Sequence, residues 1–198
     1  CLVGDLPFVA MAGGPDAVVA AARRFRDEAG CDAVKFEAAP EDAPLVARLA
    51  AAGIAPIAHL GLRPQTVLTP DGYRAQARDR DAIADLVRQA QAMTAAGAAL
   101  LLLEAVPAEA SAAVVAAVDV PVIGCGAGPA CHGHVVVTQD LLGLAPTRPP
   151  RFVPVLEQLG QRTTAAMRQW VDDIAAGRYP APEHLYRVRD PSHPGSSG

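Results

Sequence analysis

The sequence is poor in lysine, with one lysine against sixteen arginines among its 198 residues. Charged residues make up only 19% of the chain, and the formal net charge is −4. No basic cluster interleaved with aromatic residues is present, so we expect no nucleic-acid partner. No apolar run reaches the roughly 18 residues of a membrane span, and no signal peptide is visible. We therefore expect a cytoplasmic protein without a membrane partner.

Cysteine is also scarce, and its four positions form neither CxxC metal pairs nor a dense disulfide framework. We expect reduced thiols, with Cys125 and Cys131 as the one local pair close enough in sequence to examine for a bridge. Apolar residues, in contrast, make up 51% of the chain, which argues for a well-packed globule and against disorder. The length suits one domain.

Short apolar runs alternate with amphipathic stretches along the chain. The expected strands are Cys1–Gly4, Ala33–Glu37, Ala55–Leu60, Ala99–Leu103, Pro121–Ile123 and Val135–Thr138. The expected helices are Pro15–Gly30, Pro44–Ala52, Asp79–Ala96, Ala108–Ala117 and, after the Pro-rich link Pro146–Pro150, Phe152–Ala176. Unbroken apolar strands between helices are typical of a parallel sheet covered on both sides. The loop Gly61–Arg78 is long enough to suggest a function, and residues 187–198 should form a poorly ordered tail.

Four polar residues fall at the carboxyl ends of different expected strands: Asp5, Glu37, His59 and Glu104. In a β/α barrel these ends surround one rim, where active sites are built, whereas a doubly wound sheet would spread them along an edge. The pattern therefore favours an α/β fold of the TIM (β/α)8 type.

Six strands do not close an eight-stranded barrel. Because the chain starts inside an expected strand, we expect its first two βα units to be missing. Residues 1–186 would then hold strands three to eight and the C-terminal helices.

The single lysine, Lys35, lies two residues before Glu37 in an expected strand. Strand alternation places Lys35 and Glu37 on one side of the sheet and Phe36 on the other. An ammonium is a compact point charge, unlike a guanidinium, which is a reason for an arginine-rich sequence to keep one lysine. The alternative is a lysine left by chance on a solvated strand end.

Candidate chemistry follows from these side chains. Asp5 and Glu37 offer the oxygen ligands that Mg²⁺ takes alongside waters and a chelating substrate, although carboxylates that cap loops would look the same. Lys35 could balance a substrate carboxylate or a developing enolate. Glu104 follows four consecutive leucines, a setting that suits a general base or acid, with an ion pair to a nearby arginine as the alternative. His59 is either a catalyst or a hydrogen-bonded core residue.

Two other motifs lack the context that their chemistry requires. Gly124–Gly128 does not match the GxGxxG fingerprint and is interpreted as a tight loop at the rim. Cys125 has no histidine base nearby in sequence, so we expect no nucleophilic role. His132 and His134 lack the further ligands that a zinc site would need.

Taken in order, a set of short motifs resembles the ketopantoate hydroxymethyltransferase family over about residues 1–186. The motifs are Asp5-Leu6-Pro7-Phe8, Val34-Lys35-Phe36-Glu37, Ala58-His59-Leu60-Gly61-Leu62-Arg63-Pro64-Gln65, Gly72-Tyr73-Arg74-Ala75-Gln76, Leu103-Glu104-Ala105-Val106-Pro107, Gly124-Cys125-Gly126-Ala127-Gly128-Pro129 and Asp140-Leu141-Leu142-Gly143-Leu144.

The resemblance implies a Mg²⁺-dependent barrel of the phosphoenolpyruvate-mutase-like superfamily. Such an enzyme transfers a hydroxymethyl group from 5,10-methylenetetrahydrofolate to 3-methyl-2-oxobutanoate. The product is ketopantoate, for pantothenate and coenzyme A synthesis, and the reaction passes through a Mg²⁺-stabilised enolate. By position, the resemblance implies Asp5 and Glu37 at the metal, Lys35 and His59 at the 2-oxo acid, and Glu104 as the catalytic base. It also implies a homo-oligomer.

The chain departs from the family pattern at several positions. Ala38 and Ala39 stand where the family usually has two glycines, Ala77 replaces another glycine, and His132-Gly133-His134 replaces aspartate-glycine-glutamine. An upstream Asp-Ser pair of the family has no counterpart. Two alternatives therefore stay open: a related C–C lyase or mutase that acts on another 2-oxo acid, and a non-catalytic barrel that assembles with a true homologue.

Overall fold

The apolar runs form one parallel sheet in the computed structural model, which describes residues 1–67, 69 and 73–186. The chain divides into two compact units, Cys1–Val136 and Val137–Gly198, and the sheet belongs to the first. Gly72 and the tail 187–198, on which the sequence made predictions, lie outside the described residues. In the part of the chain that is described, no helix is both long and apolar enough to cross a membrane.

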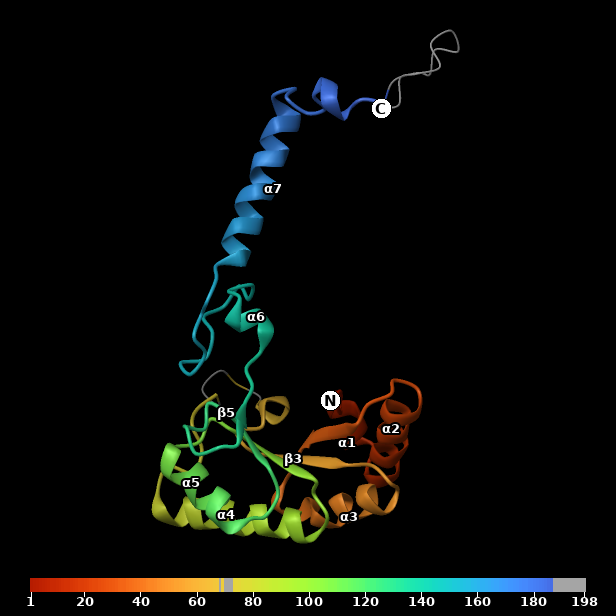
Figure 1. The fold of residues 1–198 in the computed structure, drawn as a ribbon, viewed down its shortest axis with the longest axis vertical. Coiled ribbons are helices and arrows are strands. Elements are labelled where there is room, and N and C mark those ends of the chain that lie inside the picture. The colour runs from red at the N-terminus through yellow and green to blue at the C-terminus, as the bar shows by residue number, and fades with distance from the viewer. Residues whose placement is uncertain (68, 70–72, 187–198) are drawn as a thin grey trace. The chain divides into compact units, whose positions relative to one another are not determined.

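The sheet has six strands, and every described neighbouring pair is parallel and consecutive in the chain. The strands are β1 (Val3–Asp5), β2 (Ala33–Glu37), β3 (Pro56–Gly61), β4 (Leu100–Glu104), β5 (Val122–Cys125) and β6 (Gly133–His134). A doubly wound sheet reverses its strand order at a switch point, whereas a β/α barrel adds each strand beside the one before it. The curled sheet in Figure 1 is therefore TIM-like, as the sequence predicted.

Helices cover the outer face of this sheet, where α3 and α4 run beneath the strands in Figure 1. The helices of the first unit are α1 (Phe8–Ala12), α2 (Pro15–Asp27), α3 (Ala43–Ala51), α4 (Arg80–Ala95) and α5 (Ala108–Ala117), with the short 3-10 turns η1 (Pro40–Asp42) and η2 (Pro64–Thr66). The core lies between the helices and the sheet. Its fully buried side chains include Phe36, Leu60, Leu101 and Leu103 from the strands, and Val46, Leu49, Met93 and Val114 from the helices.

Local sequence accounts for where these helices begin. Pro15 occupies the first turn of α2, where its missing N–H costs no hydrogen bond. The side chain of Asp79 accepts a hydrogen bond of 2.9 Å from the backbone N–H of Ala82 and caps α4. The predicted helix over Asp79–Ala96 is thus confirmed within one residue at each end. Helix α1, between β1 and α2, was not predicted.

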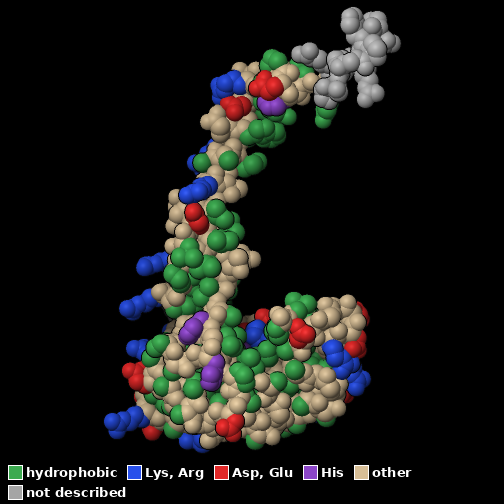
Figure 2. Space-filling view, viewed as in Figure 1, with side chains coloured by type: hydrophobic (Ala, Val, Ile, Leu, Met, Phe, Trp, Pro, Cys, Tyr) green, Lys and Arg blue, Asp and Glu red, His purple; other side chains and the backbone are tan. Residues whose placement is uncertain are grey.

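The second unit contains α6 (Thr138–Leu141), α7 (Leu159–Ala175) and η4 (Pro182–His184). Hydrophobic side chains lie exposed along α7 (Figure 2). Met167, Trp170, Val171 and Ile174 are spaced at i, i+3, i+4 and i+7 and therefore share one side of the helix.

Two predicted elements are wrong in their placement. The sixth strand is Gly133–His134, not Val135–Thr138, because the tight turn at Gly126 and Gly128 returns the chain to β5 earlier than the apolar run suggests. The last helix begins at Leu159, not Phe152, because Pro154 lacks an N–H and disfavours the helical conformation of the residue before it.

Candidate active site

The inner face of the sheet collects the five residues that the sequence proposed for the site. Asp5, Glu37 and Glu104 are the last residues of β1, β2 and β4, and His59 lies two residues before the end of β3. The register pairs Asp5 with Lys35, Glu37 with His59, and Gly61 with Glu104. Because side chains of a strand alternate between faces, this register puts all five on the face opposite Phe36. The structure therefore brings the five residues together on one face, and their roles stay predictions.

Lys35 lies between a carboxylate and an imidazole. Its Nζ is 2.8 Å from Asp5 Oδ1 and 3.5 Å from His59 Nδ1. The side chain of Lys35 is only 17% exposed, whereas that of Asp5 is 56% exposed. The ammonium therefore faces the interior of the site, and the Asp5 carboxylate reaches solvent. A lysine left on a solvated strand end does not fit this arrangement.

His59 and Glu104 form the second contact across the inner face. His59 Nε2 lies 3.3 Å from Glu104 Oε2, and the two side chains are 3% and 17% exposed. The distance is that of an ion pair, yet His59 Nε2 makes no hydrogen bond of acceptable geometry to any described residue. A small rotation of the Glu104 carboxylate is enough to aim an oxygen at the ring nitrogen. A series of contacts thus links the four strands β1 to β4: Asp5 with Lys35, Lys35 with His59, and His59 with Glu104.

Glu37 is buried and is held by the loop that follows β3. Both carboxylate oxygens accept from the backbone N–H of Gln65, at 2.9 and 3.1 Å. Burial raises the pKa of Glu37, while the Gln65 N–H and nearby positive charge lower it in part. A buried carboxylate on this face is costly to ionise without a cation beside it.

Sequence reasoning did not assign a role to Gln65. Besides its backbone contact with Glu37, its side-chain Nε2 donates to the carbonyl oxygen of Leu6 at 3.2 Å. Gln65 therefore connects the residues after β1 to the end of β2. The length of the loop suggests a function, but a backbone N–H is common to almost every residue and leaves no mark in the sequence.

The same loop is anchored to the end of β4. The N–H groups of Leu62 and Gln76 donate to the carbonyl oxygens of Glu104 and Ala105, at 2.9 and 2.8 Å. Ala77 and Ala105 have φ values of 51° and 49°, in a region that favours glycine. Ala77 is the position where the family pattern has glycine, so this departure falls on a backbone conformation that costs alanine energy.

The other departures from the family pattern are accommodated. Ala38 is buried and its N–H donates to the carbonyl of His59, while Ala39 has an ordinary extended conformation. Neither alanine needs the conformational freedom of glycine. His132 makes two hydrogen bonds with Val122, one through its backbone N–H to the Val122 carbonyl and one through Nδ1 from the Val122 N–H. This histidine therefore stabilises the pairing at the end of the sheet.

Carboxylate oxygens are the available ligands for a divalent cation in this cluster. Within residues 1–67, 69 and 73–186, no three or more His, Cys, Asp or Glu side chains are grouped so that they could hold a metal ion. Asp5 and Glu37 supply oxygen ligands of the type that Mg²⁺ prefers, and Mg²⁺ commonly keeps several waters. The donor chemistry fits a cation held by two carboxylates, with waters and a substrate completing the shell.

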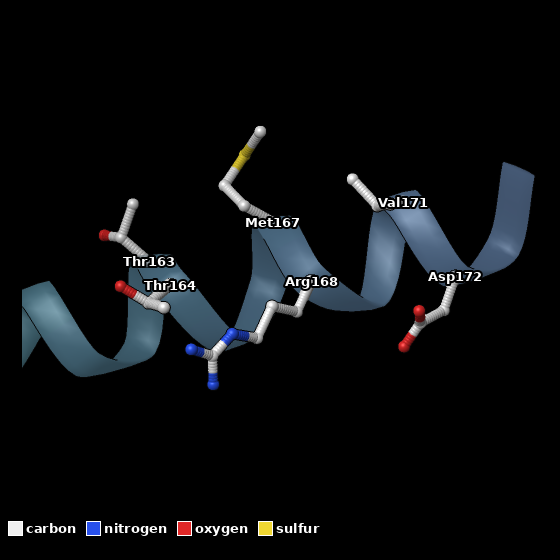
Figure 3. Close-up of a pocket in the computed structure, with 6 residues that line it drawn as sticks. All are labelled: Thr163, Thr164, Met167, Arg168, Val171 and Asp172. Atoms are coloured by element: carbon white, nitrogen blue, oxygen red, sulfur yellow. The ribbon is translucent and has the colours of Figure 1, made fainter.

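A hollow in the second unit is a poor candidate for the site. It is lined by Thr163, Thr164, Met167, Arg168, Val171 and Asp172, all from α7 (Figure 3). A binding pocket for a small polar acid needs walls that converge on it from several elements. The inner face of the sheet meets this requirement, since four strands and a loop contribute to it.

Comparison with known proteins identifies the family. A family model described as ketopantoate hydroxymethyltransferase matches residues 1–182. The 3-methyl-2-oxobutanoate hydroxymethyltransferase of Bordetella petrii is 41% identical over 189 residues, covering 96% of this chain and 69% of the relative. That of Mycobacterium ulcerans is 43% identical over 185 residues, covering 93% and 62%.

The chain spans about two thirds of the length of these relatives. Among solved structures, a putative sugar isomerase from Streptomyces coelicolor aligns with a TM-score of 0.44 at 21% identity over 62% of this chain and 31% of that one, which is too weak a similarity to carry an argument. The family match and the two relatives agree with each other and with the motifs around Asp5, Lys35, His59 and Glu104. The chain belongs to the ketopantoate hydroxymethyltransferase family.

Proposed function

We propose that the protein transfers a hydroxymethyl group from 5,10-methylenetetrahydrofolate to 3-methyl-2-oxobutanoate, and that the cluster on the inner face deprotonates the acceptor. The observation that carries the proposal is the place of Glu104. It ends β4 on the inner face, is mostly buried, and lies beside a buried imidazole whose other ring nitrogen faces the single lysine. Family membership supports the same reaction.

In the proposed reaction, the acceptor loses the proton on C3, next to its ketone. A Glu104 oxygen takes this proton, and the electron pair of the C–H bond moves toward the ketone oxygen as an enolate forms. The Lys35 ammonium would stabilise the negative charge that develops there. The methylene carbon of the donor exchanges its two C–N bonds for a C–O and a C–C bond. Water adds as one C–N bond breaks and its second proton goes to that nitrogen, and C3 attacks as the other C–N bond breaks. The second nitrogen takes the proton held by Glu104, and tetrahydrofolate leaves.

We propose that Asp5 and Glu37 hold a Mg²⁺ ion in the active protein. When bound, the ion would supply Lewis-acid polarisation of the 2-oxo acid. The chain's own contribution is to keep both carboxylates on neighbouring strand ends, with Gln65 orienting Glu37. If this proposal is right, saturating Mg²⁺ stabilises the folded protein by about 2.7 kcal/mol at 100 times its dissociation constant. Thermal melts of Asp5→Asn and Glu37→Gln should lack this gain.

We further propose that the curled sheet is part of a complete (β/α)8 barrel and that the protein assembles with copies of itself. The sequential strand order supports the barrel. Intact mass and light scattering of the purified protein test both statements. A monomer of 20.4 kDa in solution would contradict the complete barrel and the self-assembly.

The decisive experiment is hydrogen exchange at C3 of 3-methyl-2-oxobutanoate in deuterated water, followed by loss of its NMR signal in the presence of Mg²⁺. This step needs no folate, so it isolates proton removal. Glu104→Gln should slow the exchange by about 10²- to 10⁴-fold. The matched control is Glu28→Gln, which alters an exposed glutamate paired with Arg24. Equal exchange in both variants would contradict the role of Glu104.

Omitting the folate then separates the candidate reactions. Formation of 2-dehydropantoate only when the folate donor is present would support the hydroxymethyltransferase. A folate-independent product from another 2-oxo acid would favour the related lyase or mutase. Absence of exchange together with co-purification of a longer homologue would favour the non-catalytic barrel.

A further inference from the structure

His59 Nε2 is a buried polar atom that the proposed reaction does not yet use. The side chain is 97% buried, and Nε2 has no hydrogen bond among the described residues. Leaving such an atom unsatisfied destabilises the folded state, so each case in a folded protein calls for a reason. The nearest candidate partner is Glu104 Oε2, at 3.3 Å.

The other ring nitrogen determines which tautomer the imidazole adopts. His59 Nδ1 faces the Lys35 ammonium at 3.5 Å. An ammonium has three donors and no acceptor, so Nδ1 can only serve as the acceptor and carries no proton. The ring proton then resides on Nε2.

We propose that His59 is a positioning residue, whose tautomer is set by Lys35 so that Nε2–H orients the Glu104 carboxylate for proton removal. The inference rests on the proposed function, because it needs Glu104 as the proton acceptor. A hydrogen bond from Nε2 to Oε2 holds one oxygen of Glu104, and the other oxygen, Oε1, takes the proton from C3.

This role differs from a contact between His59 and the 2-oxo acid. A residue that binds substrate changes KM, whereas a residue that orients the base changes the rate of proton removal at saturating substrate. Nitrogen atoms of the ring face Lys35 on one side and Glu104 on the other. Each polar atom of His59 thus has a protein group as its nearest candidate partner, which leaves the influence of His59 to pass through Glu104.

Two amide substitutions of similar polarity distinguish the roles of the two ring nitrogens. In His59→Gln, the side-chain amide reaches about as far as Nε2 and can donate to Glu104. In His59→Asn, the amide reaches only as far as Nδ1, so it can accept from Lys35 but cannot reach Glu104. We expect the Asn variant to lose about 10- to 100-fold in the rate of C3 exchange, and the Gln variant to stay within about fivefold of the wild type. KM should change less than about twofold in both.

The outcomes distinguish this inference from the function on which it depends. Equal losses in the two variants with a raised KM would overturn the positioning role and assign His59 to substrate binding. Normal exchange in both would also overturn it. If the wild type itself shows no exchange, or Glu104→Gln has no effect, the proposed function fails instead.

A spectroscopic measurement on the wild-type protein also tests the inference. Imidazole ¹⁵N shifts of the wild-type protein report which ring nitrogen is protonated. The His59 signals are assigned by their absence in His59→Gln. If that variant does not fold, they are assigned by their perturbation on addition of the 2-oxo acid. We expect a protonated Nε2 and an unprotonated Nδ1 at neutral pH. A proton on Nδ1 would overturn the proposal.

Discussion

The two faces of the sheet are built from alternate residues of the same strands, yet their chemistry is opposite. On β4, Leu101 and Leu103 are fully buried against the helices, while Leu102 and Glu104 are partly exposed on the inner face. On β2, Phe36 enters the core, while Lys35 and Glu37 belong to the polar cluster. Residues that stabilise the fold therefore alternate along a strand with residues of the polar cluster. A substitution can lower the stability without changing the cluster, or change the cluster without lowering the stability.

The largest effect on stability should come from the outer face. Leu101→Ala removes a fully buried side chain and leaves a cavity, so we expect a loss of about 2–5 kcal/mol in the free energy of unfolding. Leu102→Ala is the matched control on the next residue of the same strand, and its loss should be smaller by at least about 1 kcal/mol because Leu102 is only partly buried. Urea unfolding measures both, and equal losses would erase the difference between the faces.

The next effect concerns Gly61, the last residue of β3, where the strand continues into the long loop. Gly61 has a φ of 89°, and a Cβ there would overlap the carbonyl oxygen of Glu104. We expect Gly61→Ala to cost roughly 2–4 kcal/mol and to slow C3 exchange by displacing Glu104. Gly53→Ala provides the control, because Gly53 has a φ of 71° but its nearest atom is the Arg26 guanidinium at 3.5 Å. The control should cost only about 1–2 kcal/mol and leave exchange unchanged.

A smaller effect follows from the charge on the inner face. Burial raises the pKa of Glu37, so the folded state binds this proton more tightly than the unfolded state does. The ordinary pKa of this carboxyl is 4.5, and the pKa in the folded state is higher. Between these two pKa values the free energy of unfolding must fall as pH rises, and the loss is complete above the pKa of the folded state. In protein stripped of metal, Glu37→Gln should therefore raise the Tm at pH 8, with the gain disappearing below about pH 4. Thermal melts across this pH range measure the difference. A Tm at pH 8 that is lower for the variant than for the wild type would contradict the prediction.

The smallest effect tests the strained backbone at the rim of the inner face. Ala77 has a φ of 51°, so Ala77→Gly should relieve strain and change stability by about 0.5–1 kcal/mol in the favourable direction. Ala75, two residues earlier, has no positive φ, and Ala75→Gly should be destabilising by a similar amount. Denaturant midpoints of the two variants should move in opposite directions. Movement in the same direction would show that the Ala77 conformation is not strained.

Much of this arrangement could be predicted because it depends on the alternation of strands and on where each strand ends. Asp5, Glu37 and Glu104 each follow an apolar run directly, and parallel strands bring such ends together. The contacts of Gln65 could not be predicted, since its backbone N–H reaches Glu37 only through the path of a long loop. The position of β6 was missed because an apolar run, Val135–Val137, lies beside the strand and not in it.

The sequence by itself determined the family, the order of strands and helices, and the five polar residues of the inner face. These properties follow from local patterns of apolar and polar residues along the chain. Only the tertiary structure decided which of the five touch, with Lys35 between Asp5 and His59, and Glu104 beside His59 Nε2. The physical reason is that these contacts join residues 24 to 45 positions apart, and strand register, not sequence spacing, sets their distances.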